Sequence, residues 1–496
     1  MQLEKGEKSR WILALAFLYL CIPVVIFLLG WVKLILSIPI SLAILYSAIR
    51  AIQQEEFFQT NLFENKKKLL VIFAILTVFV VLSGVGGFAW QNRWDHMYRN
   101  AVFRDLVQYN WPIVNFDFEE PRTLCYYLGF WLPSALVGKA FGLQAGYWFQ
   151  FVWALIGVFL AFLLISEFLK KLSYKTVLFF IFFSGLDILP FLLYQIKFGE
   201  AATILPRLLL GEHLELTLYK FNSSCNTTLL FWLYNQAVPF WVGFMMVLRE
   251  KTNRNRLFTW TLLLLYAPFP ALALVPLLVY QFFQGRRFRG EQSAARFRQF
   301  LRETITFENF TGLLIGLVIA LYFASNASAG KLHIIALNRD TVIQFSLFIS
   351  TEFIVFLLFV FRSSKRDPIL WILFFTMICF SFIQMGDSFD FAWRTCIPAA
   401  FYLMLLVIKW TDTFSLKAQW KKILFIVAIL LGCITPFMEI LRTTEHTVAY
   451  YCVEEAASES LINDPLNSVF DNPKDPSYGN FIGDYNSLFV KYLQRK

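Results

Sequence analysis

The chain has 496 residues, of which 58% are hydrophobic and 19% aromatic, with Phe alone occurring 57 times. Only 16% are charged, against about 25% in ordinary soluble domains, and the formal net charge is +10. This composition excludes a soluble globular protein of this length and directs attention to the membrane.

Long apolar runs recur along the chain, and a helix of about 20 residues crosses a bilayer. The runs lack the two-residue alternation of barrel strands, so they predict helices. We therefore expect an all-α polytopic membrane protein with about 11 transmembrane helices. The expected spans are 11–30, 34–50, 69–90, 147–168, 176–196, 227–248, 311–326, 341–361, 368–385, 396–411 and 422–440.

A further apolar segment, residues 257–284, contains "YAPFPALALVP" and has basic flanks on both sides, "REKTNRNR" and "GRRFRG". Basic flanks favour the same side of the membrane, and Pro268, Pro270 and Pro276 interrupt a helix. This pattern predicts a broken or re-entrant hairpin.

The distribution of charge predicts the orientation. If the N-terminus is cytoplasmic, the loops on that side hold 27 of the 44 Lys and Arg but only 12 of the 34 Asp and Glu. Lys and Arg concentrate in cytoplasmic loops, so we expect a cytoplasmic N-terminus and an extracytoplasmic C-terminus. The basic excess is then a topology signal, and no nucleic-acid partner is expected.

Three regions follow from this topology. Residues 1–68 form a cytoplasmic N-terminal end, two accessory helices and a basic loop. Residues 69–440 form the transmembrane core, with outer loops at 91–146 and 197–226. Residues 441–496 form an extracytoplasmic tail, in which Phe481, Tyr485, Phe489 and Tyr492 have helical spacing and predict an amphipathic helix.

The first outer loop begins with "RWDHMYRNAVFRD", just beyond an expected span. If the helix continues, Asp95 and Arg99 share one face at i, i+4 spacing. A carboxylate beside cations at the membrane surface suits a general base. An interfacial turn with a helix ion pair explains the same spacing, and spacing alone favours that simpler interpretation. The apolar segment 126–142, interrupted by Pro133, suits the interface beside Asp95.

The second outer loop carries Glu212, His213 and Glu215, followed by an Asn/Ser/Thr cluster and by Trp232. Such polar groups bind sugar hydroxyls and aromatic rings stack on sugar faces. His213 belongs to no HExxH pattern, which disfavours zinc. The alternative is structural: Asn226 caps the next helix, and Trp and Tyr form the usual interfacial belt.

The third outer connection, "GDSFDFAWRTCIPAAF", brings Asp387, Asp390 and Arg394 close to the start of a span. An arginine at headgroup depth suits a bidentate grip on phosphate, although Asp390 and Arg394 also suit a structural pair. Within the spans, Asp187 and Glu352 are costly and should face the bundle interior.

The seven cysteines show no CxxC spacing and predict neither a disulfide framework nor a zinc site. A disulfide between Cys125 and Cys225 on the outer side remains an alternative. No P-loop, dinucleotide-binding turn or nucleophile elbow occurs, so a cytosolic nucleotide donor is not supported.

Five stretches together resemble the GT-C superfamily of membrane glycosyltransferases: "RWDHMYRNAVFRDLVQYNWP", "YYLGFWLPSALVGK", "FNSSCNTTLLFWLYNQAVPFW", "FDFAWRTCIPAAF" and "FIGDYNSLFVKYL". They look like stretches of poorly characterised bacterial membrane proteins near that superfamily. The resemblance runs from about residue 69 to the end and leaves the first two helices outside the catalytic core. It implies location in the bacterial cell membrane and a sugar carried on polyprenyl phosphate.

The resemblance also implies roles for particular residues. Asp95 would be the catalytic base, with Asp105 the second candidate, and Arg394, Arg99 and Arg207 would hold the lipid phosphate. The paired acids common at the first site of the superfamily are absent, because His96 follows Asp95. The choice of base and the need for a divalent cation therefore stay open. Residues expected to contact the sugar or acceptor are His96, Glu212, His213, Asn226, Trp232, Gln236 and Asp390.

The expected function is an inverting hexosyl- or pentosyltransferase that moves a sugar from polyprenyl phosphate to an extracytoplasmic glycan, lipid or protein. Two alternatives remain. A flippase or transporter of lipid-linked glycans needs a wetted path of polar residues, whereas only Asp187 and Glu352 are clearly charged within spans. A polysaccharide polymerase or ligase would use a diphosphate-linked donor.

Overall fold

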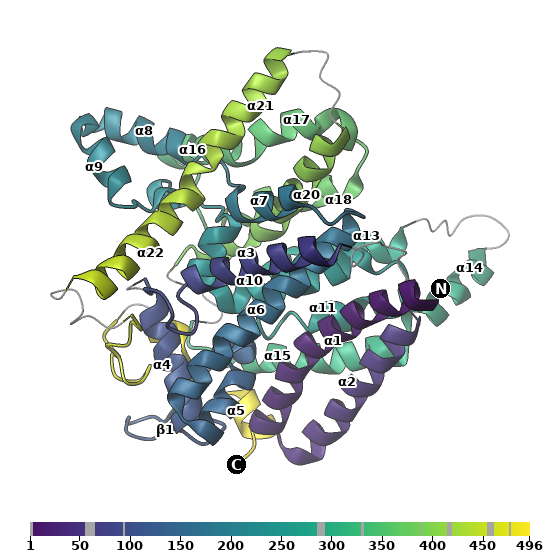
Figure 1. Cartoon of the computed structure of the whole chain (residues 1–496). Helices are drawn as coiled ribbons and strands as arrows, with labels where there is room; N and C mark the ends of the chain where they lie inside the picture. Colours follow the sequence, from purple (N-terminus) through teal and green to yellow (C-terminus); the bar gives the residue numbers. More distant parts are fainter. Residues whose placement is uncertain are drawn as a thin grey trace.

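The computed structural model describes residues 3–54, 65–92, 95–284, 293–328, 332–386, 388–413, 419–453, 461–475 and 478–496. Over these residues the chain is an all-α, multi-pass membrane protein with a few short strands (Figure 1). Seven of the described helices are long and apolar enough to cross a membrane, or up to eight if one bent pair forms a span. The seven are Arg10–Trp31, Leu34–Gln54, Leu143–Phe168, Asn226–Arg249, Arg339–Ser364, Asp390–Asp412 and Gln419–Cys452.

The expected number of about 11 spans stays a prediction, because several expected runs form shorter helices. The run 69–90 gives α3 (Lys66–Leu82), which ends before a turn where Gly84, Gly86 and Gly87 have positive φ. The run 368–385 gives α18 (Pro368–Phe380) followed by strand β4 (Ile383–Met385). The apolar runs thus predict where helices lie in the chain but do not predict how long each helix is.

The expected span 176–196 is divided into α7 (Tyr174–Phe182) and α8 (Ile188–Lys197). The backbone between them, residues 183–187, contains Gly185. A Cβ at Gly185 would lie 1.9 Å from Oε2 of Glu352, so the helix is interrupted where a buried carboxylate reaches its backbone. Irregular backbone among apolar helices occurs where protein or a polar cavity surrounds it.

The centre of the bundle is α10 (Asn226–Arg249), which packs against α6 (Leu143–Phe168). Its side chains are buried on almost every side, including Tyr234 and Trp241, as expected of a helix in a bundle core. The N-terminal hairpin of α1 (Leu3–Trp31) and α2 (Leu34–Gln54) packs against the same bundle.

Helix α15 (Phe307–Phe323) lies beside α2 and α11 (Arg256–Thr261). Arg50 of α2 forms an ion pair with Glu308 at 2.8 Å, and Ser47 donates a hydrogen bond to Thr311. The two N-terminal helices, expected to be additions outside the core, therefore support a helix that lines the main cavity. Before α15, the short helix α14 (Ser293–Thr304) meets it at a bend of 60°.

The segment predicted to form a broken or re-entrant hairpin, residues 257–284, is a series of short helices, and Asn253 donates a hydrogen bond to the carbonyl of Phe282, so its two ends lie together. It consists of α11, α12 (Pro268–Ala273) and α13 (Val275–Phe283). Pro268 begins α12 and Pro276 lies in the first turn of α13, positions where the missing N–H of proline costs no helical hydrogen bond.

One end of the bundle, which we call the mouth end, carries α4 (Asp95–Gln108), α5 (Leu132–Phe141) and the C-terminal segment, residues 461–475 and 478–496 (Figure 1). Strands β1 (Val114–Asn115), β2 (Arg122–Leu124) and β5 (Ile482–Asp484) form an antiparallel sheet there. A second sheet pairs β3 (Leu332–Ile334) with β4.

The expected amphipathic helix of the C-terminal tail is not formed. The segment instead contains β5 between two single turns, Tyr478–Asn480 and Phe489–Leu493. Phe481 and Phe489 are buried while Tyr492 is exposed, and Cys125 donates its N–H to the carbonyl of Phe481. Pairing with β2 satisfies the backbone and overrides the helical spacing of the aromatic residues.

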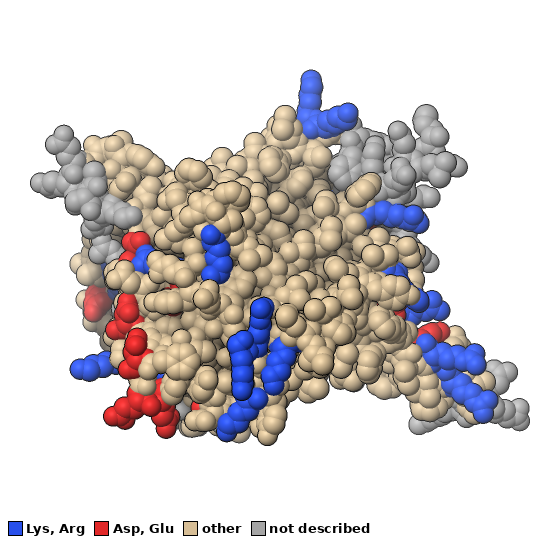
Figure 2. All heavy atoms as spheres, turned by 90° about the horizontal axis from the view of Figure 1, so that it is seen from below, with Lys and Arg blue, Asp and Glu red and all other residues tan. Residues whose placement is uncertain are grey.

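Charge separates along the bundle. Figure 2 shows most of the acidic side chains gathered at the left, the side of α4, while basic side chains lie in the lower middle and at the right. The N-terminus and α14 lie on that right side in Figure 1. We call it the basic end. Lys and Arg are in excess in the loops that the sequence predicts to be cytoplasmic.

Candidate functional site

The candidate site is a cavity of about 730 Å³ at the mouth end. Side chains from α4, α10, α11, α12, α15, α19 (Asp390–Thr395) and the C-terminal segment line it. Asp95 and Arg394, about 300 positions apart in the chain, both face this one space. Its polar residues gather near these two, and its apolar residues form an arm between α11, α12 and α15.

Asp95 is the first residue of α4, where its backbone N–H donates to Oδ1 of Asn92. A carboxylate at a helix N-terminus is favoured by the helix dipole. Nη1 of Arg99 lies 3.2 Å from Oδ2 of Asp95, and the two side chains are 3% and 39% exposed. Arg99 also donates through Nε to Asn235 of α10. The predicted i, i+4 pair is thus confirmed, with a fixed arginine and an accessible acid.

A second pair of the same kind faces the cavity from α19. Nη2 of Arg394 lies 2.7 Å from Oδ1 of Asp390, with the side chains 12% and 33% exposed. Ser388 donates its hydroxyl to the other oxygen of Asp390. One bond to Asp390 leaves further guanidinium donors on Arg394. Asp387, expected beside them, lies outside the described residues.

Tyr126 lies in the electrostatic field of all four charged groups. Burial raises the pKa of Tyr126 to about 12, with Arg99 opposing the shift. Its hydroxyl therefore stays protonated at neutral pH and can donate a hydrogen bond to an anion in the cavity. Gln236 of α10 completes this polar region, and its Oε1 is buried without a partner among the described residues.

The arm of the cavity is apolar. It is lined by Leu257, Trp260, Leu264, Phe269, Leu272, Leu313, Gly316, Leu317, Ala320 and Phe323. Leu313 and Leu317 of α15 remain 58% and 57% exposed, so the arm is open along that helix to the surroundings of the bundle. An exposed apolar groove joined to a charged pocket suits an amphipathic ligand.

The C-terminal segment supplies part of the cavity wall through Asn480 and Phe481. Asn326, which follows α15, donates hydrogen bonds to the carbonyls of Cys125 and Asn480. Asp484 donates its N–H to the carbonyl of Ser325. These contacts join the first loop, the end of α15 and the tail into one rim.

Asp105, the second candidate for the base, does not line the cavity. It is fully buried in α4 and accepts hydrogen bonds from the hydroxyl of Ser468 and the N–H of Val469. Burial raises the pKa of Asp105 to about 7, and the two hydrogen bonds act in the opposite direction. The geometry gives Asp105 the task of anchoring the C-terminal segment to α4.

His96 is likewise structural, although it follows Asp95 in sequence. Its ring is buried, its Nε2 lies 2.8 Å from the carbonyl oxygen of Phe231, and it packs on Tyr234. Burial lowers the pKa of His96 to about 3, with Arg99 adding to the shift. The imidazole is therefore neutral and joins α4 to α10 outside the cavity.

Four expected residues of the second loop also lie away from the cavity. Arg207 forms an ion pair with Glu212 at 2.5 Å. His213 stacks on Trp232, and both bind the carboxylate of Glu439 in α22 (Ile434–Cys452), through Nδ1 at 2.6 Å and Nε1 at 2.6 Å. Proposed roles for these residues in donor or acceptor binding at the cavity are not supported by this geometry.

Asn226 begins α10 and donates to the carbonyl of Phe180, so it fixes helix packing instead of binding a substrate in the cavity. The disulfide left open between Cys125 and Cys225 is absent, because both thiols are free and buried. Across the described residues, no group of three His, Cys, Asp or Glu side chains is placed to hold a metal ion.

Several lining residues were not anticipated: Asn326, Asn480 and the face of α15 that carries Gly316, whereas Tyr126 begins the segment 126–142 that was expected beside Asp95. The prolines of the broken hairpin were the available signal, since interrupted membrane helices tend to border cavities. Nothing in the sequence joins Asn326 to Asn480, because their contact depends on the tail folding back over the bundle.

The chain was compared with protein-family models, curated proteins and solved structures, and none of them matches it.

Proposed function

We propose that the chain is a GT-C-like glycosyltransferase that takes a sugar from a polyprenyl-phosphate carrier. The observation that carries the proposal is that Asp95 and Arg394 line one cavity that continues into an apolar arm open along α15. A single space thus offers a base, cations for a phosphate and a groove for a hydrocarbon chain. The acceptor would be an extracytoplasmic glycan, lipid or protein.

In the proposed reaction, the oxygen of an acceptor hydroxyl forms a bond to the anomeric carbon. The bond from that carbon to the phosphate oxygen breaks, and its electron pair leaves with the phosphate. Asp95 accepts the hydroxyl proton. Arg394 and the hydroxyl of Tyr126 stabilise the departing phosphate, and Arg99 holds the carboxylate of Asp95 in place. Attack opposite the leaving group inverts the anomeric centre.

The direct test is Asp95→Asn, which keeps the size of the side chain but removes its ability to accept the proton. We expect transfer from polyprenyl-phosphate sugar to fall at least about 100-fold, measured on purified protein of normal thermal stability. Asp117→Asn is the matched control, because Asp117 is exposed and does not line the cavity. Equal rates for the two variants would remove Asp95 from the mechanism.

A second candidate is a polymerase or ligase that uses a diphosphate-linked donor, because two arginines face the same cavity. Mass spectrometry of the lipid that copurifies with the protein distinguishes the two enzymes by the number of phosphates. It also identifies the sugar.

A further inference from the structure

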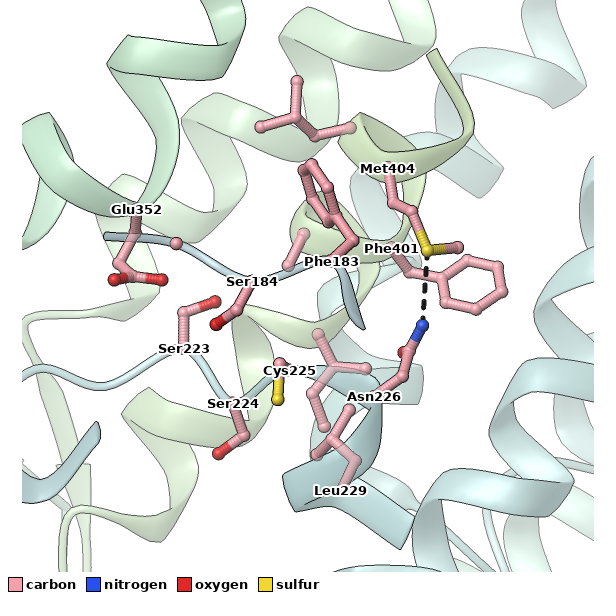
Figure 3. Close-up of a pocket in the computed structure, with 14 residues that line it drawn as sticks. Phe183, Ser184, Ser223, Ser224, Cys225, Asn226, Leu229, Glu352, Phe401 and Met404 are labelled. Carbon is pink, nitrogen blue, oxygen red and sulfur yellow. Dashed lines mark hydrogen bonds between the residues drawn. The ribbon is translucent and has the colours of Figure 1, made fainter. Parts of the chain in front are cut away.

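Two smaller cavities lie inside the described part of the bundle. Figure 3 shows the first, of about 30 Å³, between Glu352 and Asn226, whose amide donates a hydrogen bond to the sulfur of Met404. The second measures about 10 Å³ and also borders Glu352. Volumes of this size hold single water molecules, so neither cavity can take a sugar or a lipid headgroup. The surface of the basic end is suited to a larger ligand.

This surface is formed by α14, the short helix that precedes α15. The sequence of α14, SAARFRQFLRET, contains three arginines and one glutamate, so the helix has a net positive charge. Arg298 and Arg302 are exposed, and their i, i+4 spacing places both side chains on one face. Two guanidinium groups are thus accessible side by side at the surface of the protein.

The opposite face of α14 is apolar. Phe297, Phe300 and Leu301 recur at intervals of three and four residues, the pattern of an amphipathic helix. Phe300 is buried, and its ring stacks on that of Phe283, the last residue of α13, with 5.3 Å between the centroids. Phe297 is 50% exposed. The bundle therefore covers part of this apolar face, and half of the Phe297 side chain stays accessible.

A bend of 60° separates the axes of α14 and α15, so α14 does not continue the direction of α15 across the bilayer. Hydrogen bonds hold the bend. The hydroxyl of Thr306 donates to the carbonyl of Arg254 at 2.7 Å, and the amide of Asn309 donates to the carbonyl of Thr304 at 2.8 Å. The orientation of α14 is thus fixed to the start of α15 and to the turn before α11.

Apolar side chains also border the bend itself. Ile305 and Phe307 are 74% and 47% exposed, and Phe283 beside α14 is 52% exposed. An amphipathic helix with cations on one face and exposed apolar side chains on the other suits the membrane interface. There the apolar groups enter the acyl region and the cations meet the headgroups. The helix α14 and the bend have this arrangement.

The charge of the surroundings favours an anionic partner. Figure 1 places α14 at the basic end, and Figure 2 shows basic side chains at the same side. Lys and Arg beside a membrane attract acidic phospholipids. A nucleic acid or an acidic peptide would match the arginines but would leave Phe297, Ile305 and Phe307 in water. A lipid offers these apolar side chains an acyl chain.

We propose that α14 and the bend, residues 297–307, form a binding site for an acidic phospholipid. The phosphate lies between the guanidinium groups of Arg298 and Arg302, each of which can donate two parallel hydrogen bonds to it. The acyl chains pack against Phe297, Ile305 and Phe307. A choline headgroup carries a cation that the two arginines repel, so the site favours a headgroup with a net negative charge.

This site is separate from the main cavity, because no described residue of α14 lines that cavity. The two sites are joined through α15, whose residues Leu313, Gly316 and Leu317 line the apolar arm. A lipid bound at the bend holds the first turn of α15 in place. The proposal requires neither sugar transfer nor a particular orientation of the chain in the membrane.

The test is native mass spectrometry of the purified full chain, titrated in detergent with dioleoyl phosphatidylglycerol or dioleoyl phosphatidylcholine. We expect the first phosphatidylglycerol molecule to bind at least about tenfold more tightly than the first phosphatidylcholine, because each arginine near the headgroup favours the negative charge. The double variant Arg298→Gln, Arg302→Gln should lose this preference. Its binding of phosphatidylcholine should not change, since the apolar side chains remain.

The double variant Lys66→Gln, Lys67→Gln is the matched control, because it also removes two exposed cations, at the start of α3. It should keep the preference for phosphatidylglycerol. Glycerol phosphate, an anionic headgroup without acyl chains, should not displace the lipid at equal concentration. The proposal is overturned by an unchanged preference in the arginine variant, by an equal loss in the lysine control, or by displacement with glycerol phosphate.

Discussion

At the scale of single residues, the structure distinguishes between two arginines that were both expected to hold phosphate. Arg394 faces the cavity and Arg207 does not. We expect Arg394→Ala to lower sugar transfer by about 100- to 1,000-fold, because the charge that develops on the phosphate loses its main donor. Arg394→Lys should recover part of the rate, since lysine keeps the charge but not the bidentate geometry.

Arg207→Ala is the control for this prediction. Arg207 forms ion pairs with Glu212 and Glu200 and does not line the cavity. Initial rates at saturating donor, with unfolding temperatures measured in parallel, separate a catalytic loss from a folding defect. If Arg207→Ala lost as much transfer as Arg394→Ala, the assignment of the phosphate to the main cavity would be wrong.

Asp105 supplies a residue-scale prediction about pH. Its pKa is about 7 in the folded chain because of burial, against an ordinary value near 3.8. At a pH between these two values, Asp105 therefore carries a proton in the folded state and has released it in the unfolded state. The contribution of Asp105 to the free energy of unfolding is fully present below about pH 4 and is lost as the pH rises through about 7.

Asp105→Asn removes this titration while keeping an oxygen for Ser468 and Val469. We expect the variant to equal the native chain in unfolding temperature at pH 4 and to exceed it at pH 8. It should also retain sugar transfer, because Asp105 lies outside the cavity. Loss of transfer in a folded Asp105→Asn chain would instead make Asp105 the base.

At the scale of elements, the width of the apolar arm depends on the small side chains that α15 places along it, Gly316 and Ala320. A Cβ at Gly316 would lie 3.3 Å from Cγ2 of Thr261 and 3.9 Å from Cδ1 of Leu264, so a larger side chain must project into the arm. We expect Gly316→Leu to raise KM for a long-chain lipid donor at least about tenfold, with a smaller effect on a donor with a short chain.

Phe310→Leu is the matched change on the same helix, because Phe310 is exposed and outside the cavity lining. The comparison of long and short donors in both variants isolates the arm from general damage to α15. An equal rise in KM for both donors in Gly316→Leu would show that the hydrocarbon chain binds elsewhere.

The same elements show how far the sequence could be read. Long apolar runs located α6 and α10, because burial in a membrane demands them, and prolines with basic flanks located the short helices of residues 257–284. It could not locate the break between α7 and α8, since that depends on Glu352 reaching Gly185 from another helix. Likewise, i, i+4 spacing predicted the pair of Asp95 and Arg99, and closeness in sequence predicted that of Asp390 and Arg394. The contact of these pairs with one cavity that Asn480 also lines is tertiary and left no local signal.

At the scale of the whole molecule, the proposal requires the mouth end to face away from the cytoplasm. Cys452, at the end of α22, is exposed and belongs to that end, since Thr447 of the same helix accepts a hydrogen bond from Trp90 near Asp95. Arg254 lies in the exposed turn between α10 and α11, and its carbonyl accepts a hydrogen bond from Thr306, which follows α14 at the basic end. Excess Lys and Arg mark cytoplasmic loops, so the two positions should lie on opposite sides.

A chain that retains Cys452 as its single cysteine should react with a membrane-impermeant maleimide in intact cells. A cysteine-free chain that carries Arg254→Cys should react only after permeabilisation. Replacing the other thiols breaks no disulfide, because all seven cysteines are free. The reverse pattern would place Asp95 and Arg394 in contact with the cytoplasm. Transfer to an extracytoplasmic acceptor would then be impossible without a prior flipping step, so the orientation decides whether the charges at the mouth end can perform the proposed chemistry.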